Sequence, residues 1–251
     1  MSAADVILLV VAGVGAGLTG STAGLASLFS YPALLAVGLP PVTANVTNSV
    51  ALIFSSIGAV AGSRPELAGQ SRRLRPLAWA ALAGGTVGAI LLLATPSESF
   101  EKIVPFLLAG ASVAILTRRR LVAEAVSSGH HHDRRAVVVG VGVIGIYGGY
   151  FGAGAGVMIL ALLLWATSEP LPRANAIKNV VLGVANGVAA LIFVSAGDVR
   201  WSAVIPLGAG VLVGARLGPI VVRRAQPTIL RVVIGFAGLG LAVKLAIDGF
   251  A

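Results

Sequence analysis

The sequence predicts an all-α integral membrane protein: a polytopic helical bundle of two inverted repeats, each with a broken, re-entrant first helix pair and three further transmembrane helices. Composition is the first observation, because 57% of the 251 residues are hydrophobic and only 11% are charged, against about a quarter charged in soluble proteins. The second observation is a series of long apolar runs. The third is an internal duplication in which two glycine-rich interruptions recur in register.

The apolar runs account for most of the chain. A run of near 20 residues crosses a hydrocarbon core of about 30 Å, and we interpret as such spans Val42–Ala61, Pro76–Ala94, Phe100–Leu116, Pro172–Ala196, Trp201–Val222 and Pro227–Ile247. Two more apolar segments, Val6–Val37 and Ala136–Thr167, contain clustered glycines. The sequence has no cysteine, which excludes disulfides, thiol catalysis and thiolate metal sites.

The two halves of the chain repeat each other. GLTGSTAGLASLFSYP at Gly17–Pro32 is matched 128 positions later by GIYGGYFGAGAGVMIL at Gly145–Leu160. ANVTNSV at Ala44–Val50 is matched 130 positions later by ANAIKNV at Ala174–Val180. The chain is therefore an internal duplication.

We predict a first repeat over residues 1–117, a polar linker over 118–135 and a second repeat over 136–251. The linker and the loop Ser63–Arg75 are rich in arginine, which is typical of cytoplasmic loops. In the second half the basic loop is the one that carries Arg223, Arg224 and Arg231, after the span Trp201–Val222, and not the earlier loop Gly197–Arg200. The second repeat is therefore predicted to be inverted relative to the first. Both termini are then expected outside and the linker inside, and topology rather than nucleic-acid binding explains the net charge of +9.

Each glycine-rich segment is predicted to form a hairpin of two short helices. Between the cytoplasmic linker and the loop Gly197–Arg200, which is expected outside, the chain must cross the membrane an odd number of times. Pro172–Ala196 supplies one crossing, so the glycine-rich segment crosses twice or not at all. The expected arms are Val6–Thr19 with Leu25–Val37, and Ala136–Tyr147 with Ala153–Thr167. Arms of this length reach only about 20 Å, which places both breaks inside the bilayer.

Broken helices inside a membrane favour a binding site. Free backbone groups are tolerated there only when protein or a wet cavity satisfies them, and the N-terminus of each second arm directs N–H groups and a positive dipole end at an anion. The alternative is close helix packing by small residues. We expect packing to explain Gly13 and Gly17, and equally Gly210, Gly214 and Gly218.

A stripe of polar residues on one helix face follows each break and should face the interior, because polar groups are costly in lipid. Its members are Asn45, Asn48, Ser49, Ser55 and Ser56 in the first repeat, and Asn175, Lys178, Asn179 and Asn186 in the second. Lys178 takes the place of Asn48 in the other repeat, and a fixed cation suits an anionic substrate. Alternatively Lys178 snorkels to the cytoplasmic interface, and Asn45 and Asn175 link helices. The candidate substrate-binding residues are Gly20, Ser21, Thr22, Gly24, Asn45, Asn48, Ser49, Gly148, Gly149, Tyr150, Gly152, Asn175, Lys178, Asn179 and Asn186. We expect no catalytic residue, metal site or cofactor.

The order of these motifs resembles the TauE/SafE family of sulfite exporters over nearly the whole chain. The resemblance rests on the broken first segments, on LPPVTANVTNS at Leu39–Ser49 and on GVLVGARLG at Gly210–Gly218. Many relatives carry Gly-Ile-Gly-Gly-Gly in the first break, whereas this chain has GSTAG at Gly20–Gly24. The family implies a carrier of the bacterial or archaeal inner membrane that moves sulfite or an organosulfonate such as sulfoacetate, in the export direction, with an ion gradient.

The function expected from these observations is secondary transport of a small sulfur oxyanion by alternating access. Its partners would be the anion, the lipid bilayer and a coupling proton or cation, with no nucleic acid. Alternatives are an anion channel and an intramembrane enzyme with Ser21 as nucleophile. A serine nucleophile needs a general base, and all three histidines, His130, His131 and His132, lie in the linker.

Overall fold

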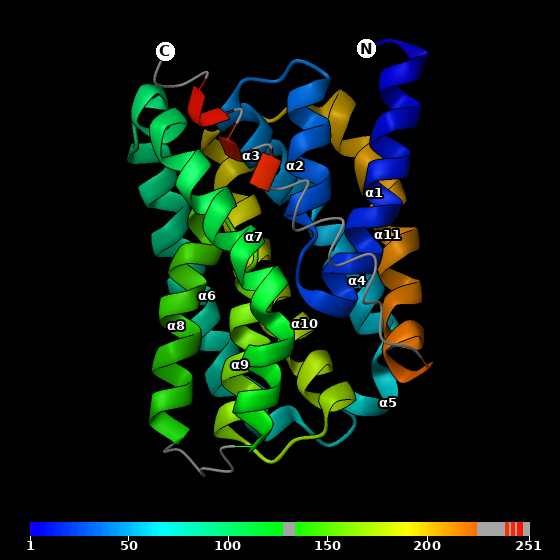
Figure 1. Cartoon of the computed structure of the whole chain (residues 1–251), viewed down its shortest axis with the longest axis vertical. Helices are drawn as coiled ribbons and strands as arrows, with labels where there is room; N and C mark the ends of the chain where they lie inside the picture. The colour runs from blue at the N-terminus through cyan, green and yellow to red at the C-terminus, as the bar shows by residue number, and fades with distance from the viewer. Residues whose placement is uncertain (128–133, 225–238, 241, 244, 248–251) are drawn as a thin grey trace.

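The computed structural model is a bundle of helices (Figure 1), and it describes residues 1–127, 134–224, 239–240, 242–243 and 245–247. In chain order the elements are α1 Ala3–Ala23, α2 Ser27–Ala36, α3 Pro41–Ala51, α4 Ile53–Gly62, α5 Arg64–Leu67, α6 Ser71–Ala94, α7 Ser97–Ser127, α8 Arg134–Tyr150, α9 Ala155–Ala166, α10 Leu171–Ala196 and α11 Trp201–Arg224. Most of the predicted span Pro227–Ile247 and the three histidines lie outside the described residues.

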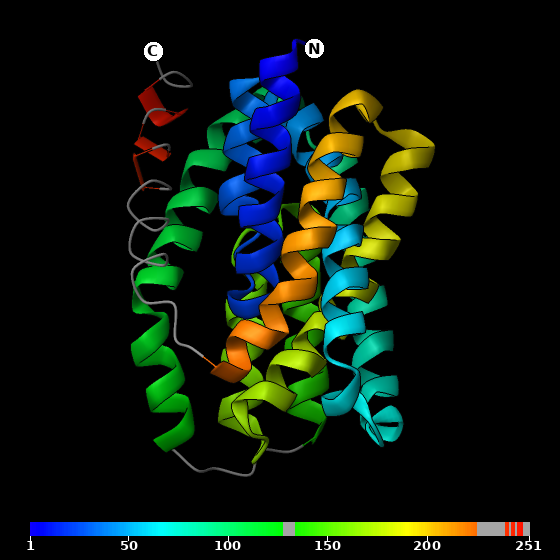
Figure 2. The same ribbon diagram turned by 90° about the vertical axis from the view of Figure 1, so that its right-hand side faces the viewer.

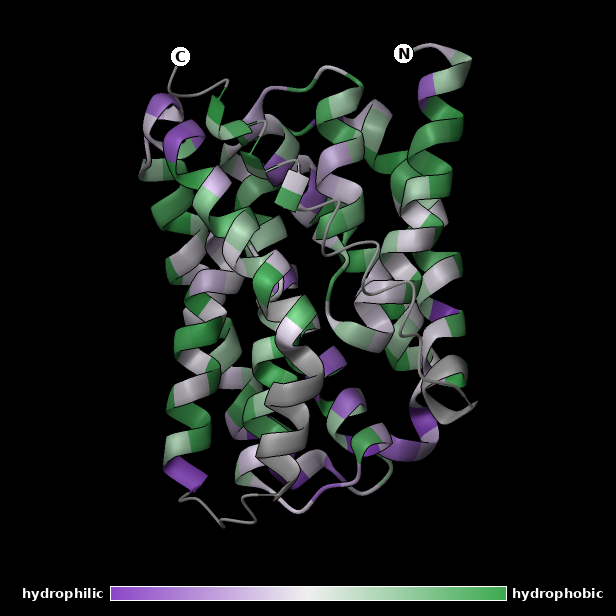
Figure 3. Ribbon diagram, in the orientation of Figure 1, coloured by the Kyte–Doolittle hydropathy of each residue, from purple (hydrophilic) through white to green (hydrophobic). Residues whose placement is uncertain are grey.

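The composition is that of a membrane protein throughout. Within the described ranges, five helical stretches are long and apolar enough to cross a membrane: α1, α3 with α4, α6, α10 and α11. The shorter apolar helices are α2 and α9. Figure 3 shows hydrophobic residues along the helices and hydrophilic ones gathered mainly toward the two ends of the bundle. The all-helical membrane fold predicted from the sequence is confirmed.

Both glycine-rich segments are interrupted, as predicted. Helix α1 begins at a capping box, in which Ser2 and Asp5 bond each other's backbone N–H, and it ends at Gly24, whose φ of 77° is left-handed. A left-handed glycine is a common helix C-cap because it carries no Cβ. The second interruption uses two such residues, Gly152 and Gly154.

The first arm is longer than the sequence analysis expected. Helix α1 has 21 residues, about 31 Å at 1.5 Å per residue, so it is long enough to cross the membrane before the chain turns back. It continues through Gly20 and Ser21 because donors from α10 satisfy the carbonyl groups at its end. The return arms are short, with 10 residues in α2 and 12 in α9.

Two close helix pairs link the halves of the sequence. Helix α1 lies along α11, as Figure 2 also shows, and a Cβ on Gly17 would lie 2.1 Å from the carbonyl oxygen of Val211. Helix α8 lies along α6, where a Cβ on Gly88 would lie 2.0 Å from the carbonyl oxygen of Ile146. The prediction that the α1 and α11 glycines serve packing is confirmed by these backbone approaches.

Helix α5 and the first turn of α8 lie at the end of the bundle opposite the N-terminus (Figure 1), and they carry Arg64 and Arg134. There Arg134 donates to the carbonyl of Arg72, and Arg73 and Arg173 pair with Glu169. Helix α7 runs on to Ser127, so the first part of the predicted linker is helical.

Candidate functional site

The two breaks meet inside the bundle. A Cβ on Gly24, in the first break, would lie 2.4 Å from the Cα of Gly156, which belongs to the first turn of α9. Such a distance is far below van der Waals contact, so the backbones touch and neither position admits a side chain. Both breaks were predicted to lie in the substrate region, and they lie in contact in the structure.

A small cavity of about 40 Å³ lies where the breaks meet. It has room for about three water molecules at roughly 10–15 Å³ each. We call it the central cavity; it is lined by Gly20, Gly24, Ala26, Ser27, Ser49, Leu52, Ser55, Ser56, Ala59, Gly148, Phe151, Gly152, Gly156, Asn179, Leu182 and Asn186. Seven candidate residues are among them: Gly20, Gly24, Ser49, Gly148, Gly152, Asn179 and Asn186.

The first turns of both return arms border the central cavity. Ala26 and Ser27 lie at the start of α2, and Gly156 lies at the start of α9. The first N–H groups of a helix have no partner within the helix, and the dipole makes this end positive. Together with the hydroxyl groups of Ser55 and Ser56, these ends form a surface suited to a small anion. The Ser49 hydroxyl also borders the cavity, but it donates to the carbonyl oxygen of Asn45 at 2.9 Å.

Three side chains of α10 hold the end of α1. Lys178 is fully buried, and its ammonium donates to the carbonyl oxygens of Gly20 at 3.1 Å and Ser21 at 3.3 Å. Asn175 and Asn179 also donate to Ser21, at 2.9 and 3.3 Å. A cation at the negative end of a helix dipole is favourable, so Lys178 stabilises the break and does not snorkel to the interface.

The end of α8 is held from the other half of the chain. Asn45 on α3 donates to the carbonyl oxygen of Tyr150 at 2.9 Å, as its repeat counterpart Asn175 does at α1. The Tyr150 hydroxyl points away, to Thr95. Asn48 does not reach this break, because its amide bonds the hydroxyl groups of Ser27 and Ser30 on α2.

Several candidates do not line the central cavity. The Ser21 and Thr22 hydroxyls donate to carbonyls one turn back in α1, at 2.7 and 2.8 Å. A Cβ on Gly149 would lie 2.3 Å from the carbonyl oxygen of Gly85, so Gly149 serves contact with α6. The side chains of Asn45, Asn175 and Lys178 donate to carbonyl groups at the helix ends. Asn48 bonds α2, and the Tyr150 ring packs against Phe100.

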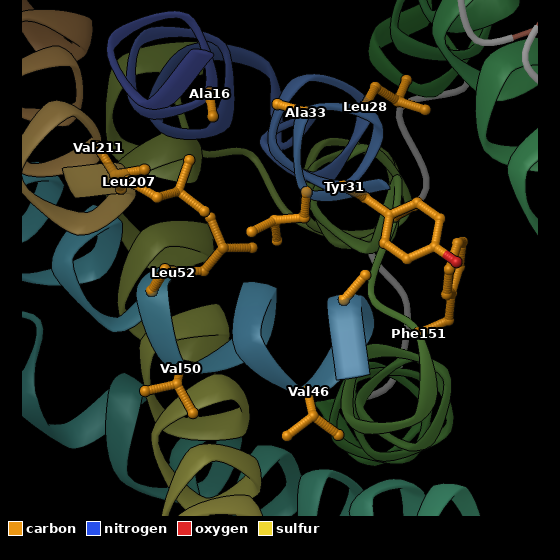
Figure 4. Close-up of a cluster of buried hydrophobic side chains, with 14 of the residues drawn as sticks. Ala16, Leu28, Tyr31, Ala33, Val46, Val50, Leu52, Phe151, Leu207 and Val211 are labelled. Carbon is orange, nitrogen blue, oxygen red and sulfur yellow. The ribbon is translucent and has the colours of Figure 1, made fainter. Parts of the chain in front are cut away.

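An aromatic cluster beside the central cavity was missed by the sequence analysis. Phe151 lines the cavity and packs edge-on against Tyr31 of α2, with ring centroids 5.5 Å apart, as Figure 4 shows. Phe100 of α7 packs against Phe151 and Tyr150 at 6.2 and 5.9 Å. Aromatic residues at a break are a visible signal, but three elements distant in sequence supply these rings. Among the described residues, no group of three or more His, Cys, Asp and Glu forms a metal site.

Comparison with known proteins identifies the family of this chain. The family model for the sulfite exporter TauE/SafE matches residues 9–245. A probable membrane transporter protein of Haemophilus influenzae is 27% identical, with 96% of this chain and 94% of that protein aligned. The probable membrane transporter protein YfcA of Escherichia coli K12 is 26% identical, with 93% and 86% aligned. No solved structure matches the chain. Since the family model covers almost its whole length, this chain belongs to the sulfite exporter TauE/SafE family and is a membrane transporter.

Proposed function

We propose that this protein is a secondary transporter that moves a small sulfur oxyanion across the inner membrane by alternating access, in the export direction. The observation that carries the proposal is the central cavity, where two half-helix N-termini and several hydroxyl groups converge inside the bundle. Free N–H groups, positive dipole ends and hydroxyl donors all favour negative charge. Half-helix ends at the middle of the membrane are typical substrate sites of transporters.

The size of the central cavity favours the smallest substrate of the family. About 40 Å³ holds roughly three waters, and sulfite has four heavy atoms whereas sulfoacetate has eight. Sulfite therefore needs the least widening of the cavity, and we propose it as the substrate.

We propose further that the two halves are inverted repeats that rock against each other. The helix pairs support this, because α1 of the first half packs on α11 and α8 of the second half packs on α6. The amides Asn45 and Asn175 also hold the opposite half's break. The arginine-rich end would be cytoplasmic, with both termini outside.

The experiment is a thermal-shift titration of the purified protein with sulfite, sulfoacetate, sulfate, phosphate and chloride. We expect sulfite to raise the melting temperature most. Gly148→Leu, which fills the central cavity, should abolish the shift. Gly110→Leu is the matched control, because no atom lies within 4 Å of its Cβ position and it does not line the cavity. A sulfite shift that survives Gly148→Leu would contradict the proposed site.

The two rival functions make different predictions. A channel would pass single-channel currents, whereas a carrier shows saturable exchange stimulated by substrate on the far side. An intramembrane hydrolase would need the Ser21 hydroxyl to face a substrate, but it donates to the Gly17 carbonyl and lies where a Cβ on Gly218 would meet it at 1.8 Å. We therefore favour the carrier.

A further inference from the structure

The two breaks differ in what satisfies the ends of their first arms. Gly20 and Ser21 at the end of α1 correspond to Gly148 and Gly149 at the end of α8, at the repeat offset of 128. At α1 the Lys178 ammonium bonds both carbonyl oxygens. At α8, in the described part of the chain, neither carbonyl oxygen accepts a hydrogen bond.

Local geometry explains why the carbonyl oxygens of Gly148 and Gly149 have no donor in the described part of the chain. The N–H of Gly152, which would continue the helix by bonding Gly148, donates instead to Tyr147 at 3.0 Å. The repeat counterpart of Lys178 is Asn48, and its amide is used by two hydroxyl groups of α2. The end of α8 thus carries the negative end of a helix dipole without the ammonium that its counterpart has.

A buried acceptor lies on a side chain that contacts the end of α8. The side chain of Asn45 is fully buried, and its Oδ1 atom has no hydrogen-bond partner. Its Nδ2 atom is held 2.9 Å from the carbonyl oxygen of Tyr150, the residue after Gly149. That bond fixes the amide, so Oδ1 stays near the end of α8. Buried polar atoms without partners are rare, and a bound ion is one physical reason for them.

We propose that a sodium ion binds at the end of α8, with the carbonyl oxygens of Gly148 and Gly149 and Oδ1 of Asn45 among its ligands. The ion would take the place that the Lys178 ammonium fills at α1. Half-helix C-terminal ends and free carbonyls coordinate sodium in other transporters with broken helices. The second unpartnered amide oxygen, on Asn175, lies at the break where Lys178 already supplies the cation.

The site is placed to couple ion and substrate. Gly148 lines the central cavity, so a bound cation would lie next to an anion there and each would favour binding of the other. This coupling role rests on the proposed function, whereas cation binding itself does not.

The test is the melting temperature of the purified protein without sulfite, in sodium chloride or choline chloride at equal ionic strength. We expect a saturable rise with sodium and none with choline. Asn45→Ala should weaken the apparent sodium affinity at least about tenfold. Asn175→Ala is the matched control: the same truncation at the lysine-capped break should leave the sodium response intact. Asn48→Lys should supply the missing ammonium, so that the protein no longer responds to sodium.

Either of two results would overturn the site: equal melting temperatures in sodium and choline for the unaltered protein, or a sodium response that survives Asn45→Ala. If Asn48→Lys does not fold, the Asn45 and Asn175 variants still decide. Titrating sulfite at constant sodium tests the transport proposal separately, since an anion shift without a sodium response removes only the cation site.

Discussion

Gly148 and Gly149 are neighbours in α8 with different surroundings, and we expect an added methyl group to have opposite effects at the two positions. A Cβ on Gly148 meets only the Cβ of Ala155, at 3.8 Å, which is ordinary contact beside the central cavity. A Cβ on Gly149 lies 2.3 Å from the carbonyl oxygen of Gly85 and 2.9 Å from its Cα. Backbone of α6 must therefore move to admit it.

The magnitudes follow from these surroundings. Alanine is about 1 kcal/mol more favourable than glycine in a helix, so Gly148→Ala should keep or raise the melting temperature, by about 2–4 °C at most. Its methyl group takes the room of about one of three waters in the cavity. We expect sulfite affinity to fall at least about tenfold, or 1.4 kcal/mol. Gly149→Ala overpacks the contact with α6, which costs about 1–3 kcal/mol, and should lower the melting temperature.

Two measurements separate the effects: the melting temperature without ligand, and the sulfite concentration that gives half of the maximal thermal shift. Gly148→Ala should raise the second without lowering the first, whereas Gly149→Ala should mainly lower the first. Sulfite binding by Gly148→Ala at unaltered affinity would refute the assignment of the central cavity as the anion site. A stable Gly149→Ala would refute the packing argument.

Three further predictions concern the breaks and the topology. Lys178→Ala removes two charge-assisted hydrogen bonds, about 1.5–3 kcal/mol each at most, although the Ser21 carbonyl keeps two amide donors. We expect a lower melting temperature and loss of sulfite transport in liposomes. Unchanged transport would remove Lys178 from the mechanism. Gly24→Ala should prevent folding because of the contact of Gly24 with Gly156. Gly38 has a φ of 85° and open space around it, so Gly38→Ala should lower the free energy of unfolding only by the left-handed strain of about 1–2 kcal/mol. Equal melting temperatures of the two variants would contradict this. In this cysteine-free chain, Ser97→Cys should react with an impermeant thiol reagent in intact cells and Ala68→Cys only after permeabilisation, and the reverse pattern would invert the proposed topology.

Part of this structure was readable from the sequence. Glycine clusters mark both breaks because a left-handed turn needs glycine, and the duplication indicates that two such breaks come from matching positions. The length of α1 could not be predicted, since its last turn persists only because side chains of α10 donate hydrogen bonds to its carbonyl groups. The direction of the Lys178 side chain could not be predicted either. The sequence pattern places Lys178 on the inner face of its helix, but it does not show whether the ammonium enters a cavity or bonds the end of another helix.

Charge balance at the central cavity leads to a last prediction. Each break contributes one positive helix end and one negative end of about half a charge, and these cancel, which leaves the Lys178 ammonium. One divalent sulfite and one sodium ion would then make the occupied site neutral. Lys178 stays with the protein, so a cycle that moves one sulfite with one sodium ion would carry one net negative charge.

A membrane potential should therefore drive sulfite out of the negative compartment. One charge is worth about 2.3 kcal/mol per 100 mV, which corresponds to a gradient of about 50-fold. In liposomes with sodium equal on both sides and a potential set by potassium and valinomycin, we expect faster sulfite efflux when the interior is negative. Efflux that is independent of the potential would mean that sulfite moves with a second cation, or as the monovalent ion with one sodium. In both cases the net charge that crosses the membrane in each cycle is zero.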